Sequence, residues 1–125
     1  MAGKRILVVD DDPSIRLLLR LVFESSGYDV SEAPHGVAAL IRIRRAVPDL
    51  VVTDMLMPVM DGGALIKHLK SDPQTAEVPI VAVTGDSDAK AQALDADVVM
   101  SKPFHQSALL EIVNSLLGAQ KLSYG

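Results

Sequence analysis

The sequence contains no cysteine and no tryptophan among its 125 residues. Without cysteine, disulfide bonds, thiolate zinc sites and cysteine nucleophiles are excluded, and a reducing cytoplasm is the natural setting. Aromatic residues make up only 3% of the chain, so platforms for stacking nucleic-acid bases are scarce. The net charge of −4 also argues against a direct nucleic-acid partner, because phosphate backbones attract basic surfaces.

Long hydrophobic runs are absent as well. Only four apolar residues follow Lys4 and Arg5 before the first acids, too few for the apolar region of a signal peptide. No run approaches the ~20 apolar residues that a membrane span needs. We therefore expect a cytoplasmic protein without membrane insertion. The length fits a single domain, expected over residues 1–119, with a frayed tail over residues 120–125.

Apolar segments and amphipathic patterns alternate along the chain. Apolar segments predict strands at residues 5–9, 28–33, 50–54, 78–84 and 98–101. Amphipathic segments predict helices at residues 13–25, 36–46, 63–70, 87–94 and 106–117. Apolar strands separated by amphipathic helices are typical of a parallel sheet covered on both faces, since each right-handed crossover lays its helix against the sheet. The predicted fold class is α/β.

Polar residues follow four of the predicted strands. They are Asp10, Asp11 and Asp12 after the first strand, Asp54 at the end of the third, Thr84 at the end of the fourth and Lys102 after the fifth. In open sheets of parallel strands, ligands bind outside the carboxyl ends of the strands. We therefore expect these side chains to meet at one edge of the sheet.

Carboxylates at such an edge repel one another, by about 4 kcal/mol for a pair ~4 Å apart at an effective dielectric constant near 20. A divalent cation offsets this repulsion, and hard oxygen ligands suit Mg²⁺. A carboxylate beside the ion can attack an activated phosphoryl group, whose oxygens Lys102 and Thr84 could contact. The sequence therefore indicates a magnesium site that handles phosphate. Asp12, which precedes Pro13, is instead expected to cap the following helix.

Four segments resemble the receiver domain of bacterial two-component response regulators. In chain order they read "ILVVDDDPSIR", "VVTDMLMPVMDGG", "VAVTG" and "SKPF". The resemblance covers essentially the whole chain and implies a flavodoxin-like fold, with five parallel strands in the order 2-1-3-4-5. It also implies that a sensor histidine kinase or a histidine phosphotransfer protein donates a phosphoryl group. The phosphorylated chain would then switch a surface that contacts a downstream protein.

Carried over position by position, the resemblance implies a role for each residue of the site. Asp54 is the expected phospho-acceptor, Thr84 the switch hydroxyl and Lys102 the lysine that pairs with the phosphoryl group. The expected Mg²⁺ ligands are Asp10, Asp11, Asp54 and the backbone carbonyl of Leu56. The family typically has a cis peptide bond after this lysine, so we expect one between Lys102 and Pro103.

Three features depart from the family pattern, one of which is Asp95, standing where a helix-ending glycine is common. Val99 stands three positions before Lys102, where the best-known members carry an aromatic residue, so a tyrosine-rotamer switch is absent. The interval from Thr84 to Lys102 is 18 positions, about four fewer than the family leads us to expect, or roughly one helical turn. We therefore expect the helix at residues 87–94 to be shortened or partly irregular.

Two other interpretations stay open. The sequence from Asp10 to Ser14 also resembles the opening motif of haloacid-dehalogenase-like phosphatases, in which Asp10 would be the nucleophile. That interpretation leaves Asp54 and the turn after it unexplained. The other alternative is an interaction module that works without phosphorylation.

We interpret a basic cluster and the three histidines as structural residues without a role in binding or chemistry. We expect the cluster to form a solvated helix face; it consists of Arg42, Arg44 and Arg45. The three histidines lie on different predicted elements without the spacing of metal ligands, so we expect no metal role for them.

Overall fold

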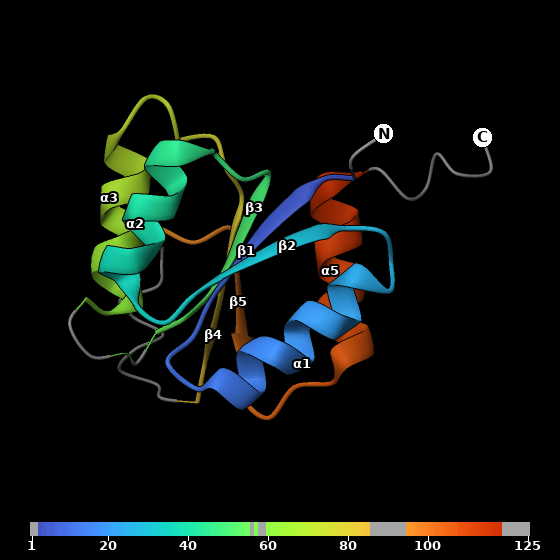
Figure 1. Ribbon diagram of the computed structural model, residues 1–125. Coiled ribbons are helices and arrows are strands. Elements are labelled where there is room, and N and C mark those ends of the chain that lie inside the picture. Colours follow the sequence, from blue (N-terminus) through green and yellow to red (C-terminus); the bar gives the residue numbers. More distant parts are fainter. Residues whose placement is uncertain (1–2, 56, 58–59, 86–94, 119–125) are drawn as a thin grey trace.

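Every predicted strand belongs to one parallel sheet in the computed structural model, which describes residues 3–55, 57, 60–85 and 95–118. The strands are β1 (Arg5–Val9), β2 (Asp29–Ala33), β3 (Leu50–Asp54), β4 (Ile80–Thr84) and β5 (Val98–Ser101). Their order across the sheet is β2-β1-β3-β4-β5, which confirms the prediction (Figure 1). The described helices are α1 (Pro13–Glu24), α2 (Gly36–Arg45), α3 (Gly62–Ser71) and α5 (Gln106–Leu117). The helix expected at residues 87–94 and the tail at residues 120–125 lie outside the described residues.

The helices cover both faces of the sheet, α2 and α3 on one and α1 and α5 on the other (Figure 1). Alternate residues of β1 face the two layers: Leu7 and Val9 belong to the core under α2 and α3, and Ile6 and Val8 to the core under α1 and α5. Burial on both faces explains why the strands are continuously apolar rather than alternating. No helix in the described part of the chain is long and apolar enough to cross a membrane.

The boundaries of several elements differ from the prediction by one or two residues. β4 begins at Ile80 instead of residue 78, because the N–H of Val78 donates to the carbonyl of Thr75 in a turn and Pro79 has no N–H. The first helix stops before Gly27, as expected. The φ angle of Gly27 is 93°, a left-handed conformation that favours glycine.

Side chains cap the helices that flank the carboxyl edge of the sheet. Asp12 Oδ1 accepts the N–H of Ser14 at 2.8 Å at the start of α1, which confirms the expected capping role. His35 Nδ1 accepts the N–H of Ala38 at 3.2 Å at the start of α2. These caps fix where the chain turns from each strand into the following helix.

The strand register brings the ends of the central strands together. Val9 is the partner of Thr53 in β3, and Asp54 is the partner of Val83 in β4. The residue that follows Val9 therefore lies beside Asp54. Thr84 is the partner of Ser101, so the residue after β5 lies beside the end of β4.

Candidate functional site

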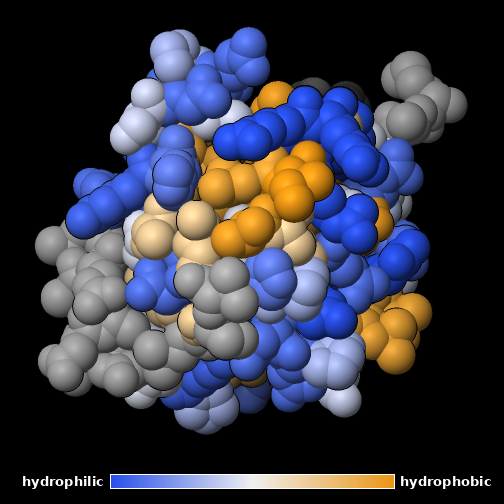
Figure 2. Space-filling view, turned by 60° about the vertical axis from the view of Figure 1, so that its left-hand side comes forward, coloured by the Kyte–Doolittle hydropathy of each residue, from blue (hydrophilic) through white to orange (hydrophobic). Residues whose placement is uncertain are grey.

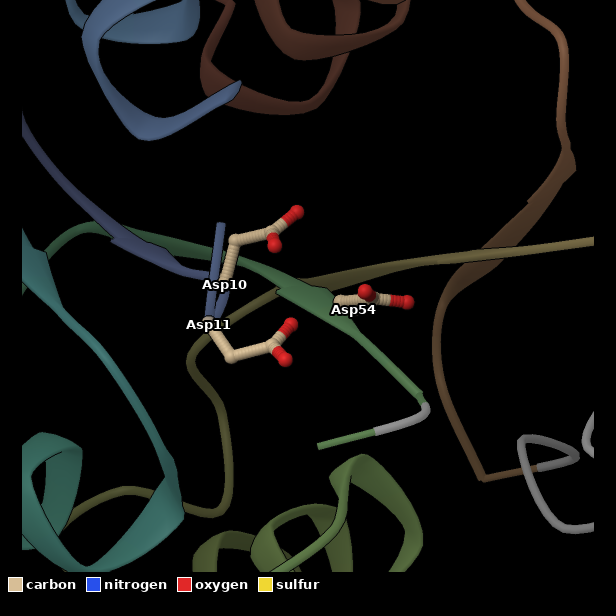
Figure 3. A group of neighbouring side chains, drawn as sticks. All are labelled: Asp10, Asp11 and Asp54. Carbon is tan, nitrogen blue, oxygen red and sulfur yellow. The ribbon is translucent and has the colours of Figure 1, made fainter. Parts of the chain in front are cut away.

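Three carboxylates meet where the strand register predicts. One carboxylate oxygen from each of Asp10, Asp11 and Asp54 lies within 4.8 Å of the other two. Figure 3 shows the three side chains at the ends of β1 and β3. Asp10 and Asp54 are buried, with 5% and 8% of their surface exposed, whereas Asp11 is exposed. The cluster is therefore open to solvent on the side of Asp11.

Lys102 connects this cluster to β4. Its Nζ lies 3.3 Å from Asp54 Oδ2, and its backbone N–H donates to the carbonyl of Thr84 at 2.9 Å. Thr84 is buried at the end of β4. The peptide bond between Lys102 and Pro103 is cis, as expected. The structure thus brings Asp10, Asp11, Asp54, Thr84 and Lys102 to one edge of the sheet, and Leu56 lies outside the described residues.

The buried position of Asp10 makes its negative charge costly. Burial raises the pKa of Asp10 from 3.8 to about 6. The N–H of Asp12, which donates to Asp10 Oδ1 at 2.9 Å, opposes this increase, while the charge of Asp54 adds to it. Ile15 and Phe104 line the same small cavity as these carboxylates. An apolar wall and a second acid therefore disfavour the ionised form.

The chemistry of these groups fits a hard divalent cation. Three carboxylate oxygens in close proximity, one of them on a side open to solvent, match the preference of Mg²⁺ for a few carboxylates, several waters and phosphate oxygens. A dication would favour the ionised form of Asp10 and reduce its repulsion with Asp54.

Arg16 supports the acidic cluster and was missed by the sequence interpretation. Its Nη1 donates to the backbone carbonyl of Asp10 at 2.7 Å, and its Nε donates to Glu32 at 3.2 Å. The side chain thereby ties α1 and β2 to the loop that carries Asp10. The sequence does contain a signal for this contact. Arg16 lies one helical turn after the capping residue Asp12, and helical side chains tilt toward the N-terminus, so its side chain can reach back to that loop.

Gly62 brings α3 close to the end of β3. A Cβ atom at this position would lie 2.5 Å from the backbone oxygen of Asp54. A residue with a side chain would therefore fit here only if the backbone shifted. The N–H of Gly62 also donates to the carbonyl of Met55 at 3.1 Å. Asp61 caps the helix by accepting the N–H of Ala64 at 2.9 Å. The start of α3 therefore braces the strand end that presents Asp54.

The raised pKa of Asp10 predicts that Asp10→Asn stabilises the metal-free protein. The folded state binds this proton more tightly than the unfolded state, so the wild-type free energy of unfolding should fall as the pH rises from about 4 to 6. Asparagine keeps an acceptor for the N–H of Asp12. At pH 7 in EDTA, urea unfolding should show a gain of about 1–3 kcal/mol for the variant.

This gain should shrink toward pH 4 and should also shrink when Mg²⁺ is added, because the ion stabilises the wild-type protein. A variant that is less stable than the wild type at pH 7 in EDTA would contradict the electrostatic account of the cluster.

Arg16→Met should destabilise the protein and weaken divalent-cation binding, because it leaves the carbonyl of Asp10 without its charged donor. We expect a loss of about 1–3 kcal/mol in urea unfolding and a several-fold weaker Mg²⁺ affinity. Arg20→Met is the matched control, since Arg20 pairs with Glu24 and Glu32 but has no contact with the acidic loop. The control should lose less than about 1 kcal/mol and keep its Mg²⁺ affinity. Equal effects of the two changes would contradict a positioning role for Arg16.

Comparisons with known proteins agree with this geometry. The sequence matches the response regulator receiver domain over residues 6–114. It is 36% identical over 117 residues to the DNA-binding dual master transcriptional regulator RpaA of Synechocystis, covering 90% of this chain and 48% of RpaA. It is 34% identical over 119 residues to sporulation initiation phosphotransferase F of Bacillus subtilis, covering 94% and 96% of the two chains. The chain thus spans about half the length of RpaA and nearly all of phosphotransferase F.

A solved receiver domain has the same fold. The receiver domain of the sensor histidine kinase PA1611 of Pseudomonas aeruginosa has a TM-score of 0.87 at 26% identity, covering 94% of this chain and all of that chain. A magnesium ion is coordinated in its active-site cleft. Sequence and fold therefore favour the receiver interpretation over the phosphatase alternative. The chain belongs to the receiver domains of response regulators, which are phosphorylated on an aspartate in two-component systems.

Proposed function

We propose that Asp54 is the aspartate that accepts the phosphoryl group. The observation that carries the proposal is its position at the end of the central strand β3, between the carboxylates of Asp10 and Asp11 and the ammonium group of Lys102. Asp10 is held in place by the N–H of Asp12 and is disfavoured as an ionised nucleophile by burial. Asp54 therefore combines proximity to a metal site with contact to a cation.

The proposed reaction moves a phosphoryl group from a phosphohistidine to Asp54. An oxygen of Asp54 attacks phosphorus and forms a P–O bond, the P–N bond to the donor imidazole breaks, and that nitrogen takes up a proton. Lys102 moves from Asp54 to a phosphoryl oxygen and neutralises its charge, and the hydroxyl of Thr84 donates to another. A Mg²⁺ ion held by Asp10, Asp11, Asp54 and the Leu56 carbonyl would neutralise charge on the transferring group. Slow attack by water on phosphorus later breaks the P–O bond to Asp54, restores the carboxylate and releases inorganic phosphate.

The exposed apolar face of α1 supports a helical protein as the phosphoryl donor. Leu17, Leu18 and Leu21 are 54%, 39% and 56% exposed, although such residues usually lie in the core. Because α1 begins at Pro13, directly after the acidic loop, Leu17 lies about 7.5 Å along the helix axis from that loop. We assign it to docking of a sensor histidine kinase or a histidine phosphotransfer protein. Side chains at positions 17, 18 and 21 suit an apolar partner helix.

The proposed output begins at Thr84. Movement of the Thr84 hydroxyl toward the phosphoryl group would shift an equilibrium between two conformations of the domain. The free energy of this equilibrium changes by the difference between the interaction energies of the phosphoryl group with the two conformations. Val99 of β5 packs against the core under α2 and α3. Because valine has no aromatic ring, the signal leaves without an aromatic rotamer change at this position. We propose that the downstream target is a protein and that the receiver domain, over residues 1–119, does not contact DNA itself.

Asp54→Asn should abolish labelling by acetyl phosphate in the presence of Mg²⁺, because the amide cannot form the acyl phosphate. Intact mass and peptide mapping should place the adduct of the wild-type protein on Asp54. Asp12→Asn is the matched control: it makes the same charge change beside the cluster, and asparagine caps a helix as well as aspartate does. The control should be labelled like the wild type. Labelling that survives in Asp54→Asn but disappears in Asp10→Asn would contradict the proposal and favour the phosphatase mechanism.

The double change Leu17→Ser and Leu21→Ser should slow phosphotransfer from a protein donor at least about tenfold, because it removes apolar contacts with the donor. Labelling by acetyl phosphate should be unchanged, since this small donor does not use α1. The donors are the phosphorylated histidine kinases and phosphotransfer proteins of the source organism, measured by transfer of ³²P. Ile41→Ser on α2, where the side chain is 49% exposed, is the control and should have no effect. Equal rates for all variants would exclude α1 as the docking face.

A further inference from the structure

We propose that a pocket at the amino edge of the sheet binds a small organic phosphate of the size of a nucleoside monophosphate. The pocket lies between β1, β2 and the last turn of α2, and its volume is about 250 Å³. Its lining includes Arg5, Arg42, Arg45, Ser31, Leu7 and Ile43. This site is separate from the acidic cluster, which lies at the carboxyl edge of the same strands. The proposal does not depend on phosphorylation of Asp54.

Three guanidinium groups are available to a ligand there. Within the described residues, the side chains of Arg5, Arg42 and Arg45 form no ion pair. Favourable interaction with the helix dipole explains basic residues in the last turn of α2. It does not explain Arg5, which reaches the pocket from β1. Cations from two separate elements therefore border one hollow.

The neighbouring acids leave an excess of positive charge. Asp29 is the register partner of Arg5, and Asp49 accepts the backbone N–H of Arg5 through Oδ2 at 2.7 Å, but neither lines the pocket. Asp10 of the acidic cluster is five residues beyond Arg5, about 16 Å along β1 at 3.3 Å per residue. That distance exceeds the Debye length of about 8 Å at physiological ionic strength, so the cluster has little effect on the pocket.

The lining chemistry favours a phosphomonoester over a simple inorganic ion. Arginine binds phosphate oxygens in a bidentate geometry, and several arginines suit a dianion better than a single carboxylate. Ala46 adds exposed apolar surface beside the arginines, above the buried side chains of Leu7 and Ile43, and Ser31 adds a hydroxyl group. Figure 2 shows hydrophobic residues surrounded by hydrophilic ones on the side of the molecule that carries α2. The exposed large apolar residues of this helix are Val37 and Ile41, which do not line the pocket. The volume of about 250 Å³ lies below the ~300 Å³ lower bound of common ligand pockets, so the hollow would hold the phosphate and part of one nucleotide and not a nucleic-acid strand.

Arg44 provides a matched control on the same helical turn. It carries the same charge as Arg42 and Arg45, but it lines a different hollow, between α2 and α3, together with His68. A general attraction of anions to the basic end of α2 would depend on all three arginines. A ligand seated in the pocket would depend on Arg42 and Arg45 but not on Arg44.

The test is an NMR titration of the ¹⁵N-labelled protein with adenosine 5′-monophosphate. We expect saturable shifts of the amides of Leu7 and Ser31. Arg42→Gln and Arg45→Gln should each weaken binding about tenfold, the effect of losing one charge-assisted hydrogen bond, whereas Arg44→Gln should change it less than twofold. Adenosine and inorganic phosphate should each bind at least about tenfold more weakly than the nucleotide.

A second variant tests the shape of the pocket without changing its charge. Ser31 is exposed on the edge strand β2, so Ser31→Leu should fold while its larger side chain fills part of the pocket and abolishes the titration. All variants should retain labelling of Asp54 by acetyl phosphate, so a failure here is distinguishable from a failure of the phospho-acceptor assignment. The proposal is overturned by an absence of saturable shifts at millimolar nucleotide, by equal weakening in Arg44→Gln, or by equal affinity for inorganic phosphate.

Discussion

The repulsion among three carboxylates at one edge of the sheet is the constraint on which the site depends. Asp10 and Asp54 are both buried, and the pKa of Asp10 is raised to about 6 because its charge is poorly solvated. The ammonium group of Lys102 offsets part of this cost from the side of Asp54. The metal-free arrangement is therefore electrostatically unfavourable. It favours a bound cation, and a cation in turn favours the approach of a phosphoryl group.

The surrounding structure keeps these groups from moving apart. β1 and β3 are central strands buried on both faces, so their ends cannot separate without exposing the core. Arg16 fixes the loop after β1 through the carbonyl of Asp10, and Gly62 lets α3 press against the end of β3. Residues outside the cluster thus determine how closely its charges approach. Such preorganised charge is what electrostatic catalysis requires.

The two ends of the parallel sheet carry different clusters of charge. The carboxyl edge holds Asp10, Asp11 and Asp54 together with Lys102, and the amino edge carries Arg5 and the basic last turn of α2 beside Asp29 and Asp49. A net charge of −4 conceals this separation. The expectation that Arg42, Arg44 and Arg45 form a solvated helix face is confirmed in that all are exposed, but they border two different hollows. Averages over the chain therefore give little information about local binding chemistry.

The sequence by itself determined the order of strands and helices, and with it the set of polar residues that meet at one edge. This was possible because strands buried on both faces are continuously apolar, and parallel strands place their carboxyl ends together. Only the tertiary structure decided that Asp10 is buried while Asp11 is exposed, and that Arg16 contacts the acidic loop. Periodicity specifies which face a residue occupies. Burial, pKa and long-range contacts depend on distances between elements, which only packing sets.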